Sequence, residues 1–253
     1  MDPRPGRAPR RNAPRLRRVF LLSPARVNGV RAGYLLNPAA TFALARQFHS
    51  DGLPVADVFT FTSGLYFRGK ITYARRFAGD DACVIRVITA NSGLVDPSLQ
   101  LTASALRAFG EVDIDVSDPR YHEPLRRDAQ VLERRLAADG NVVLLGSIAT
   151  AKYRDVLLDV FGARLVFPSD FVGRGDMSRG GLLLRSARDG IELPYASVLG
   201  ATVHGVRPPR LPRLPRPSGV TTSAGTAPAP SPSGAPPAAA RSLVPPRRRA
   251  RPA

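Results

Sequence analysis

The chain has 253 residues, a formal net charge of +17 and a single cysteine, Cys83. This length allows one large domain or two small ones. One cysteine excludes an intrachain disulfide and a cysteine-based zinc cluster, and the three histidines are scattered, so we expect no metal site and no cofactor. Cys83 lies in an apolar run and is predicted to be a buried structural thiol.

The basic residues are concentrated at the two ends of the chain. Residues 1–18 contain seven arginines and one acid, and residues 207–253 contain nine arginines, no acid and 13 of the 25 prolines. Residues 19–206 are close to neutral, with 21 basic and 19 acidic side chains. We therefore expect one folded domain over 19–206, flanked by two disordered tails. The tails are either solvated low-complexity sequence or electrostatic arms for a polyanion such as nucleic acid.

The sequence favours a cytoplasmic location. Residues 17–22 resemble a twin-arginine export signal, but Pro24, Arg26, Asn28 and Arg31 interrupt the apolar region that should follow. No run approaches the roughly 20 apolar residues that cross a membrane. We expect no membrane partner.

Strand-like apolar runs alternate with helix-like periodicity along the domain. Strands are predicted over 19–24, 83–90, 141–146 and 164–168, with a short edge strand over 112–116. Helices are predicted over 38–49, 63–78, 124–140 (ending at Gly140), 150–162 and near 178–189, while 55–61 is ambiguous. This alternation predicts an α/β fold with a mainly parallel sheet and helices on both faces.

Three segments follow predicted strands: 89–97, 146–153 and 168–181. Ligands bind outside the carboxyl ends of strands in such sheets. The third segment, PSDFVGRGDMSRGG, combines permissive glycines with charged residues, so we interpret it as the mouth of a site. Four side chains of these segments are expected around one cleft: Asp96, Ser147, Arg174 and Asp176.

Two resemblances meet at these segments. Residues 60–186 resemble an uncharacterised bacterial domain family of unknown function, through SGLYFRGKITYARRFA, VVLLGSIATAKYRDVL and LVFPSDFVGRGDMSRGGLLLR. VVLLGSIATAKYRDVL and LVFPSDFVGRGDM also resemble the second half of the uracil-DNA glycosylase fold. There, a strand ending in L-W-G-x-x-A is followed by a strand ending in H-P-S-P and a loop containing R-G. Residues 168–169 and 174–175 match this pattern, but Phe167 takes the place of the histidine.

The second resemblance implies a protein that acts on nucleic acid or a nucleotide, in its concrete form an N-glycosidic hydrolase. Asp96, in what remains of the family's G-Q-D-P-Y loop, would position water, and Asp176 would be a second catalytic carboxylate. Phosphate or backbone contacts would come from Ser169, Arg174, Gly175 and Arg179, beside Phe167 in the pocket. A non-catalytic nucleic-acid- or nucleotide-binding module, and an interaction protein acting through its basic tails, are the alternatives.

The candidate residues also have structural interpretations. Asp176 suits the N-cap of the helix near 178, Asp96 before a proline suits a turn, and Arg174 with Asp176 suits a surface ion pair. The helix over 63–78 carries Tyr66, Arg68 and Lys70. It is either an ordinary solvated face over buried aromatics, or a surface for phosphate contact and base stacking.

Overall fold

A six-stranded mixed sheet forms the centre of the fold in this computed structural model, which describes residues 15–79 and 82–212. Its strand order is β4-β3-β1-β6-β7-β8. The strands are β1 (Leu16–Leu22), β3 (Cys83–Ile88), β4 (Leu94–Val95), β6 (Leu136–Leu145), β7 (Leu165–Pro168) and β8 (Tyr195–Ser197). The inner four are parallel, and β4 and β8 are antiparallel to their neighbours. The predicted α/β fold with a mainly parallel sheet is confirmed.

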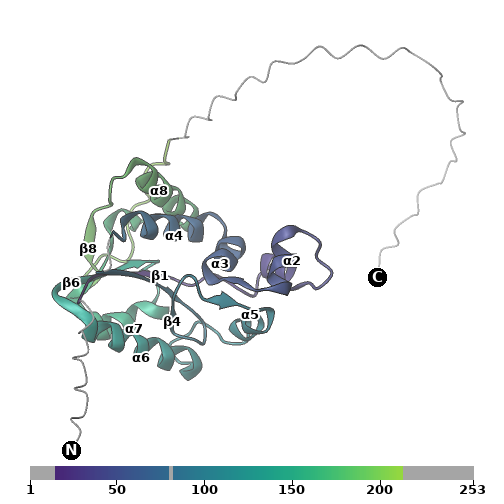
Figure 1. Cartoon of the computed structure of the whole chain (residues 1–253). Coiled ribbons are helices and arrows are strands. Elements are labelled where there is room, and N and C mark those ends of the chain that lie inside the picture. Colours follow the sequence, from purple (N-terminus) through teal and green to yellow (C-terminus); the bar gives the residue numbers. More distant parts are fainter. Residues whose placement is uncertain (1–14, 80–81, 213–253) are drawn as a thin grey trace, which may run out of the picture. The chain divides into compact units, whose positions relative to one another are not determined.

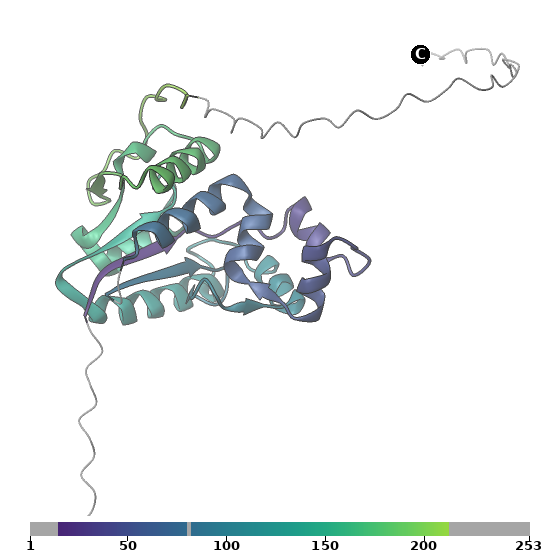
Figure 2. The same cartoon turned by 45° about the horizontal axis from the view of Figure 1, so that its top comes forward.

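Helices cover both faces of this sheet. Figures 1 and 2 show α4 and α8 over one face and α6 and α7 over the other. The helices are α1 (Val30–Leu36), α2 (Ala43–Ser50), α3 (Val55–Ser63), α4 (Leu65–Phe77), α5 (Ala103–Gly110), α6 (Pro119–Arg135), α7 (Ala151–Phe161) and α8 (Asp176–Asp189). Two 3-10 turns, η1 (Gly162–Arg164) and η2 (Ser169–Phe171), and a two-stranded ribbon of β2 (Leu53–Pro54) and β5 (Gln100–Leu101) complete the described elements.

The central strand β1 lies in the middle of the hydrophobic core. Val19, Phe20, Leu21 and Leu22 are all fully buried, because helices cover the sheet on both sides. A continuous apolar run is typical of a parallel strand that is buried on both faces. Leu22 pairs with Val87 of β3 on one side and with Leu145 of β6 on the other. The strands β1, β3 and β6 therefore end at the same edge of the sheet.

Several boundaries differ from the predictions. β1 begins at Leu16, which is buried, so residues 16–18 belong to the sheet instead of the tail. The ambiguous stretch 55–61 lies in helix α3. Helices α1 and α5 were not predicted, and the helix predicted over 38–49 begins only at Ala43. Most of the two tails, residues 1–14 and 213–253, lies outside the described residues.

The segment before β6 shows two further differences. Helix α6 begins five residues before the predicted start, because the Asp118 side chain accepts a hydrogen bond from the Arg120 amide (2.9 Å) and Pro119 suits the first turn. The chain enters β6 at Leu136, so Gly140 lies in a strand and is not a helix stop. The edge strand predicted over 112–116 is wrong, since these residues form a loop.

None of the helices in the described part of the chain is both long enough and apolar enough to cross a membrane.

Candidate functional site

A cleft of about 650 Å³ opens at the edge where the parallel strands end. Ser23 follows β1, Ala90 follows β3 and Ser147 follows β6, and Asp176 of α8 closes the rim. The chain leaves β1 toward the face of α4 and leaves β6 toward the face of α7, so the two connections diverge. A crevice at such a divergence is the usual ligand site of an open parallel sheet.

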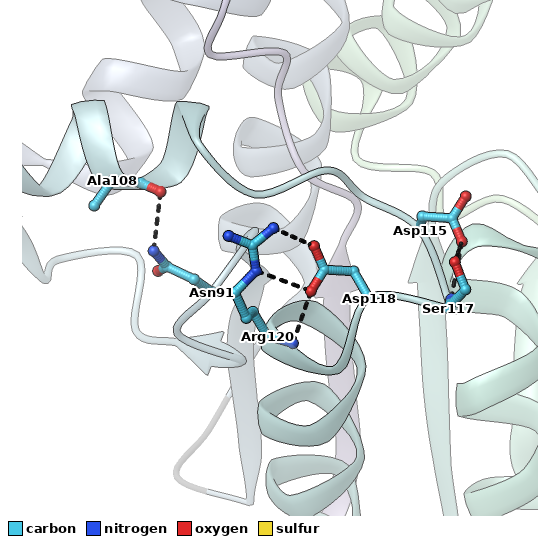
Figure 3. Close-up of polar contacts among 6 residues, drawn as sticks. All are labelled: Asn91, Ala108, Asp115, Ser117, Asp118 and Arg120. Atoms are coloured by element: carbon cyan, nitrogen blue, oxygen red, sulfur yellow. Dashed lines mark hydrogen bonds and ion pairs between the residues drawn. The ribbon is translucent and has the colours of Figure 1, made fainter.

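One wall of the cleft is formed by the end of α5 and the loop between α5 and α6, which line it with residues 109–110 and 112–114. Figure 3 shows three contacts that hold this wall: Asn91 to Ala108 (3.1 Å), Asp115 to Ser117 (2.7 Å) and Asp118 to Arg120 (2.7 Å). The hydrogen bond from Ser117 to the Asp115 side chain is local, and local bonds of this kind favour a turn over pairing with another strand. They explain why no edge strand forms here.

Helices α4 and α8 lie beneath the cleft and form its floor, and their backbones are in direct contact. A Cβ atom on Gly69 of α4 would lie 2.7 Å from the Gly180 carbonyl oxygen of α8, and one on Gly180 would lie 2.8 Å from Tyr66 Cα. No larger residue fits at either position without a shift of backbone. This close packing brings Tyr66 of α4 next to Arg179 of α8, so Gly180 of the glycine-rich segment serves helix packing.

Among the glycines before α8, Gly173 is the one whose backbone requires glycine. Its φ is +71°, and a Cβ there would collide with the Val206 carbonyl. Gly175 has a φ of −81° and open space around it. The structure therefore gives Gly175 no conformational reason to be glycine, and it serves as the N-cap residue of α8.

Lys70 is buried beneath the cleft, with only 1% of its surface exposed. Its Nζ donates to the Ser23 carbonyl oxygen (2.6 Å) and lies 2.9 Å from Ser23 Oγ. The ammonium group also lies 4.5 Å from the centre of the Tyr66 ring and 4.9 Å from that of Phe67. Burial lowers the pKa of Lys70 to about 7, against an opposing effect of Asp176. No carboxylate of the described residues forms an ion pair with it.

Two tyrosines complete the floor. The Tyr66 residue is 7% exposed and lines the cleft, yet its hydroxyl has no hydrogen-bond partner among the described residues. Burial raises the pKa of Tyr66, against the nearby Arg179 guanidinium. Burial also raises the pKa of Tyr153, which is held beside Ser23 and the Ser147 amide. Both hydroxyls therefore stay protonated at neutral pH.

The amino end of α7 opens into the cleft, and the loop over 146–150 connects it to β6. Ser147, Thr150 and Lys152 line the cleft there. Thr150 is the N-cap residue, but its side chain caps no backbone amide. The Ser147 hydroxyl accepts a hydrogen bond from the Ala149 amide (3.3 Å), which shapes the loop. A helix start with uncapped amides and a positive partial charge favours an anion.

Of the four residues expected around one cleft, Ser147 and Asp176 line it, and Asp96 and Arg174 do not. Asp96 accepts hydrogen bonds from the Ser98 amide (3.0 Å) and hydroxyl (2.6 Å) and pairs with Arg86 (3.1 Å). This is the turn that was the structural alternative for Asp96.

The residues predicted in the loop before α8 are engaged in local contacts. Arg174 donates to the Asp170 carbonyl (2.9 Å) and the Ser178 hydroxyl (3.2 Å), and the Ser169 hydroxyl donates to the Pro194 carbonyl (3.3 Å). These contacts shape the loop, and neither Arg174 nor Ser169 reaches the cleft lining.

Asp176 is the first residue of α8, after its N-cap, and its ion-pair partner is Arg179 (3.5 Å) instead of Arg174. Arg179 is buried and also donates to the Phe171 carbonyl (3.2 Å). Phe167 is buried in β7, away from the cleft. Arg68 is exposed on α4 and does not line the cleft.

Sequence reasoning missed Ser23 and Tyr153 as site residues, and it placed Lys70 on a helix that was either a solvated face or a surface for phosphate contact, whereas Lys70 is buried. Ser23 was predicted to lie within the first strand, 19–24, whereas β1 ends at Leu22 and Ser23 follows it, at the same edge as the three segments that were considered. Lys70 lies three residues after Phe67 and four before Ala74, so helical spacing places it on the apolar face of the helix and gave a signal for its burial.

The described residues contain no group of three or more histidine, cysteine or acidic side chains placed to hold a metal ion. The chain matches no protein-family model, no curated protein and no solved structure. The site is therefore interpreted from its own geometry.

Proposed function

We propose that the cleft binds a nucleotide, free or within nucleic acid, with its phosphate at the amino end of α7. The observation that carries this proposal is the convergence of Ser147, Thr150 and Lys152 on the cleft at a helix start without side-chain capping. Backbone amides, hydroxyls and an ammonium group together suit a phosphate. The volume of about 650 Å³ is in the range of small-molecule sites.

The remainder of the cleft suits the sugar and base. Tyr66 and Phe109 contribute aromatic surface to the lining. Aromatic side chains provide a surface on which a base can stack, so this part of the cleft suits the base.

The second candidate is an N-glycosidic hydrolase, the reaction that the resemblance to uracil-DNA glycosylases suggests. Asp176 supports it, because this carboxylate lines the same cleft and could stabilise positive charge that develops on the sugar. Asp96 has no part in this version, since it lies in a turn outside the cleft. Release of free base separates the hydrolase from a binding module.

The test is a calorimetric titration of the full chain with nucleoside monophosphates and with short single-stranded and duplex oligonucleotides. Lys152→Ala should weaken binding by about tenfold to a hundredfold, the range for a lost hydrogen bond to a charged group. Arg174→Ala removes the same charge outside the cleft and should leave the affinity unchanged.

Chromatography of the same mixtures for released base decides between the two candidates. If no nucleotide or oligonucleotide binds, the proposal is wrong. If Arg174→Ala weakens binding as much as Lys152→Ala, the phosphate lies at the loop before α8, as the sequence predicted.

A further inference from the structure

We propose that Ser23 is a nucleophile, activated by Lys70, for acyl transfer from a small carboxylic ester. This inference goes beyond the proposed nucleotide site and does not depend on it, because it needs only an acyl group in the cleft. It rests on the contact between two side chains from separate elements, one at the end of β1 and one in α4.

The fold places Ser23 where a nucleophile must lie. It directly follows the central strand at the carboxyl edge, lines the cleft, and is held in register by its amide, which donates to the Leu145 carbonyl (3.2 Å). Ser23 Oγ and the Tyr153 hydroxyl both lie over Gly146, since a Cβ there would be 3.1 and 2.9 Å from the two oxygens. Residue Ser23 is 5% exposed, so its hydroxyl is largely shielded from bulk water.

The position of Lys70 and the burial of its amine suit it to act as the base. Its Nζ lies 2.9 Å from Ser23 Oγ, within reach for proton transfer, and its bond to the Ser23 carbonyl fixes its position. Aromatic rings surround the amine, and no carboxylate of the described residues forms an ion pair with it. Burial therefore favours the neutral amine, which accepts a proton.

Four other groups that bear on this pair can titrate or carry charge: Tyr66 of α4, Tyr153 of α7, and Asp176 and Arg179 of α8. Burial keeps both tyrosines protonated at neutral pH. Asp176 favours the charged form of Lys70, but burial has the larger effect. The Tyr66 hydroxyl is buried beside the Arg179 guanidinium and keeps its proton, so it does not compete with Lys70 as the base.

The reaction balances with water as the only other reactant. Ser23 Oγ attacks the ester carbonyl carbon while its proton moves to Lys70 Nζ. The tetrahedral intermediate collapses, the bond to the leaving alcohol breaks, and that oxygen takes the proton from Lys70. Water then attacks the acyl-serine and gives a proton to Lys70. The serine oxygen leaves and recovers the proton, which releases the carboxylic acid.

The experiment treats the full chain with a fluorophosphonate and, separately, with p-nitrophenyl acetate, and follows adducts by intact mass and peptide mapping. One adduct is expected on Ser23, with a labelling rate that rises with pH through a midpoint near 7. Lys70→Met should slow labelling by about a hundredfold or more, the contribution of a general base. Ser23→Ala should abolish the adduct. Ser63 also lines the cleft, and Ser63→Ala should leave the adduct on Ser23 unchanged.

Two results would overturn the proposal. The first is no adduct on Ser23 in the wild-type chain, a result that holds even if Ser23→Ala fails to fold. The second is labelling of Ser23 that is independent of pH, or that proceeds at the wild-type rate in Lys70→Met. Lys70 would then serve only to satisfy the end of β1.

Discussion

Lys70 lies beneath the cleft, between Ser23 and the ring of Tyr66. It belongs to a basic stretch, yet it is the only lysine or arginine among the described residues that is 1% exposed or less. Its ammonium is desolvated and is satisfied by Ser23 and by aromatic rings instead of by a carboxylate. A buried charge of this kind opposes folding unless it is neutralised.

The stability of the protein should therefore depend on pH through Lys70. Its pKa is about 7 in the folded chain and 10.5 in the reference state, so between these values the unfolded chain holds a proton that the folded chain has released. The free energy of unfolding then rises with pH over that window, and below it the full cost of the buried charge is present. In Lys70→Met this contribution is absent.

Urea denaturation of both proteins at pH 6, 8 and 9.5 provides the measurement. The stability of the wild type relative to Lys70→Met should increase from the lowest to the highest pH. Since the other titrating groups are common to both chains, a difference that stays constant would mean that Lys70 remains charged in the folded state.

At the scale of elements, the pairing of α4 with α8 decides the shape of the site. Gly69 and Gly180 let the two backbones touch, and this contact brings the floor residues of both helices together. The neighbouring Gly181 lies on the same helix but faces Leu211. A Cβ atom on Gly181 would lie 3.5 Å from the Leu211 side chain, which is an ordinary contact distance.

Substitution of Gly180 and of Gly181 by alanine gives a matched pair of variants that tests this packing. Gly180→Ala should lower the free energy of unfolding by about 1–3 kcal/mol, the usual cost of overpacking, because the new methyl meets backbone atoms. Gly181→Ala should raise it by about 0.5–1 kcal/mol, since alanine favours the helix and meets only ordinary contact. Thermal melts of the two variants beside the wild type check both signs.

Equal effects of the two substitutions would contradict the close packing of α4 and α8. The labelling rate of Ser23 in Gly180→Ala gives a second readout, because separation of the helices should move Lys70 away from Ser23 and slow the reaction.

At the scale of the whole molecule, the charge is divided unevenly. Residues 1–14 contain four arginines and Asp2, and residues 213–253 contain seven arginines and no acid, so these two terminal segments together carry +10 of the net +17. The sheet and its buried core lie within 15–212, and Leu16 belongs to that core.

Deletion of 1–14 and 213–253 should leave a folded domain with weaker non-specific DNA binding. The slope of log K against log salt concentration should also flatten, because it scales with the number of phosphates neutralised. Fluorescence anisotropy with a labelled duplex between 50 and 200 mM salt measures both. A truncation that also removed residues 15–18 should unfold, because β1 begins at Leu16.

An unchanged salt slope after this deletion would place the DNA-binding surface on the domain itself. The nucleotide affinity of the cleft is the internal control, since neither deleted segment contributes a described lining residue.

Much of the architecture could be read from the sequence. The runs around Val19, Val143 and Val166 are apolar and short, and helical periodicity separates them, so a layered α/β fold follows from burial alone. The edge at which ligands bind follows from the direction of parallel strands. Ser147 and Asp176 were placed correctly for this reason.

Only the tertiary structure decided which side chains share the cleft. Asp96 and Arg174 have the right chemistry at the right edge, but their own neighbours satisfy them with hydrogen bonds. Lys70 and Ser23 are 47 residues apart and meet because helix α4 packs across the end of β1. Local pattern determines which segments become strands and helices, whereas a contact between distant side chains depends on packing that no local pattern contains.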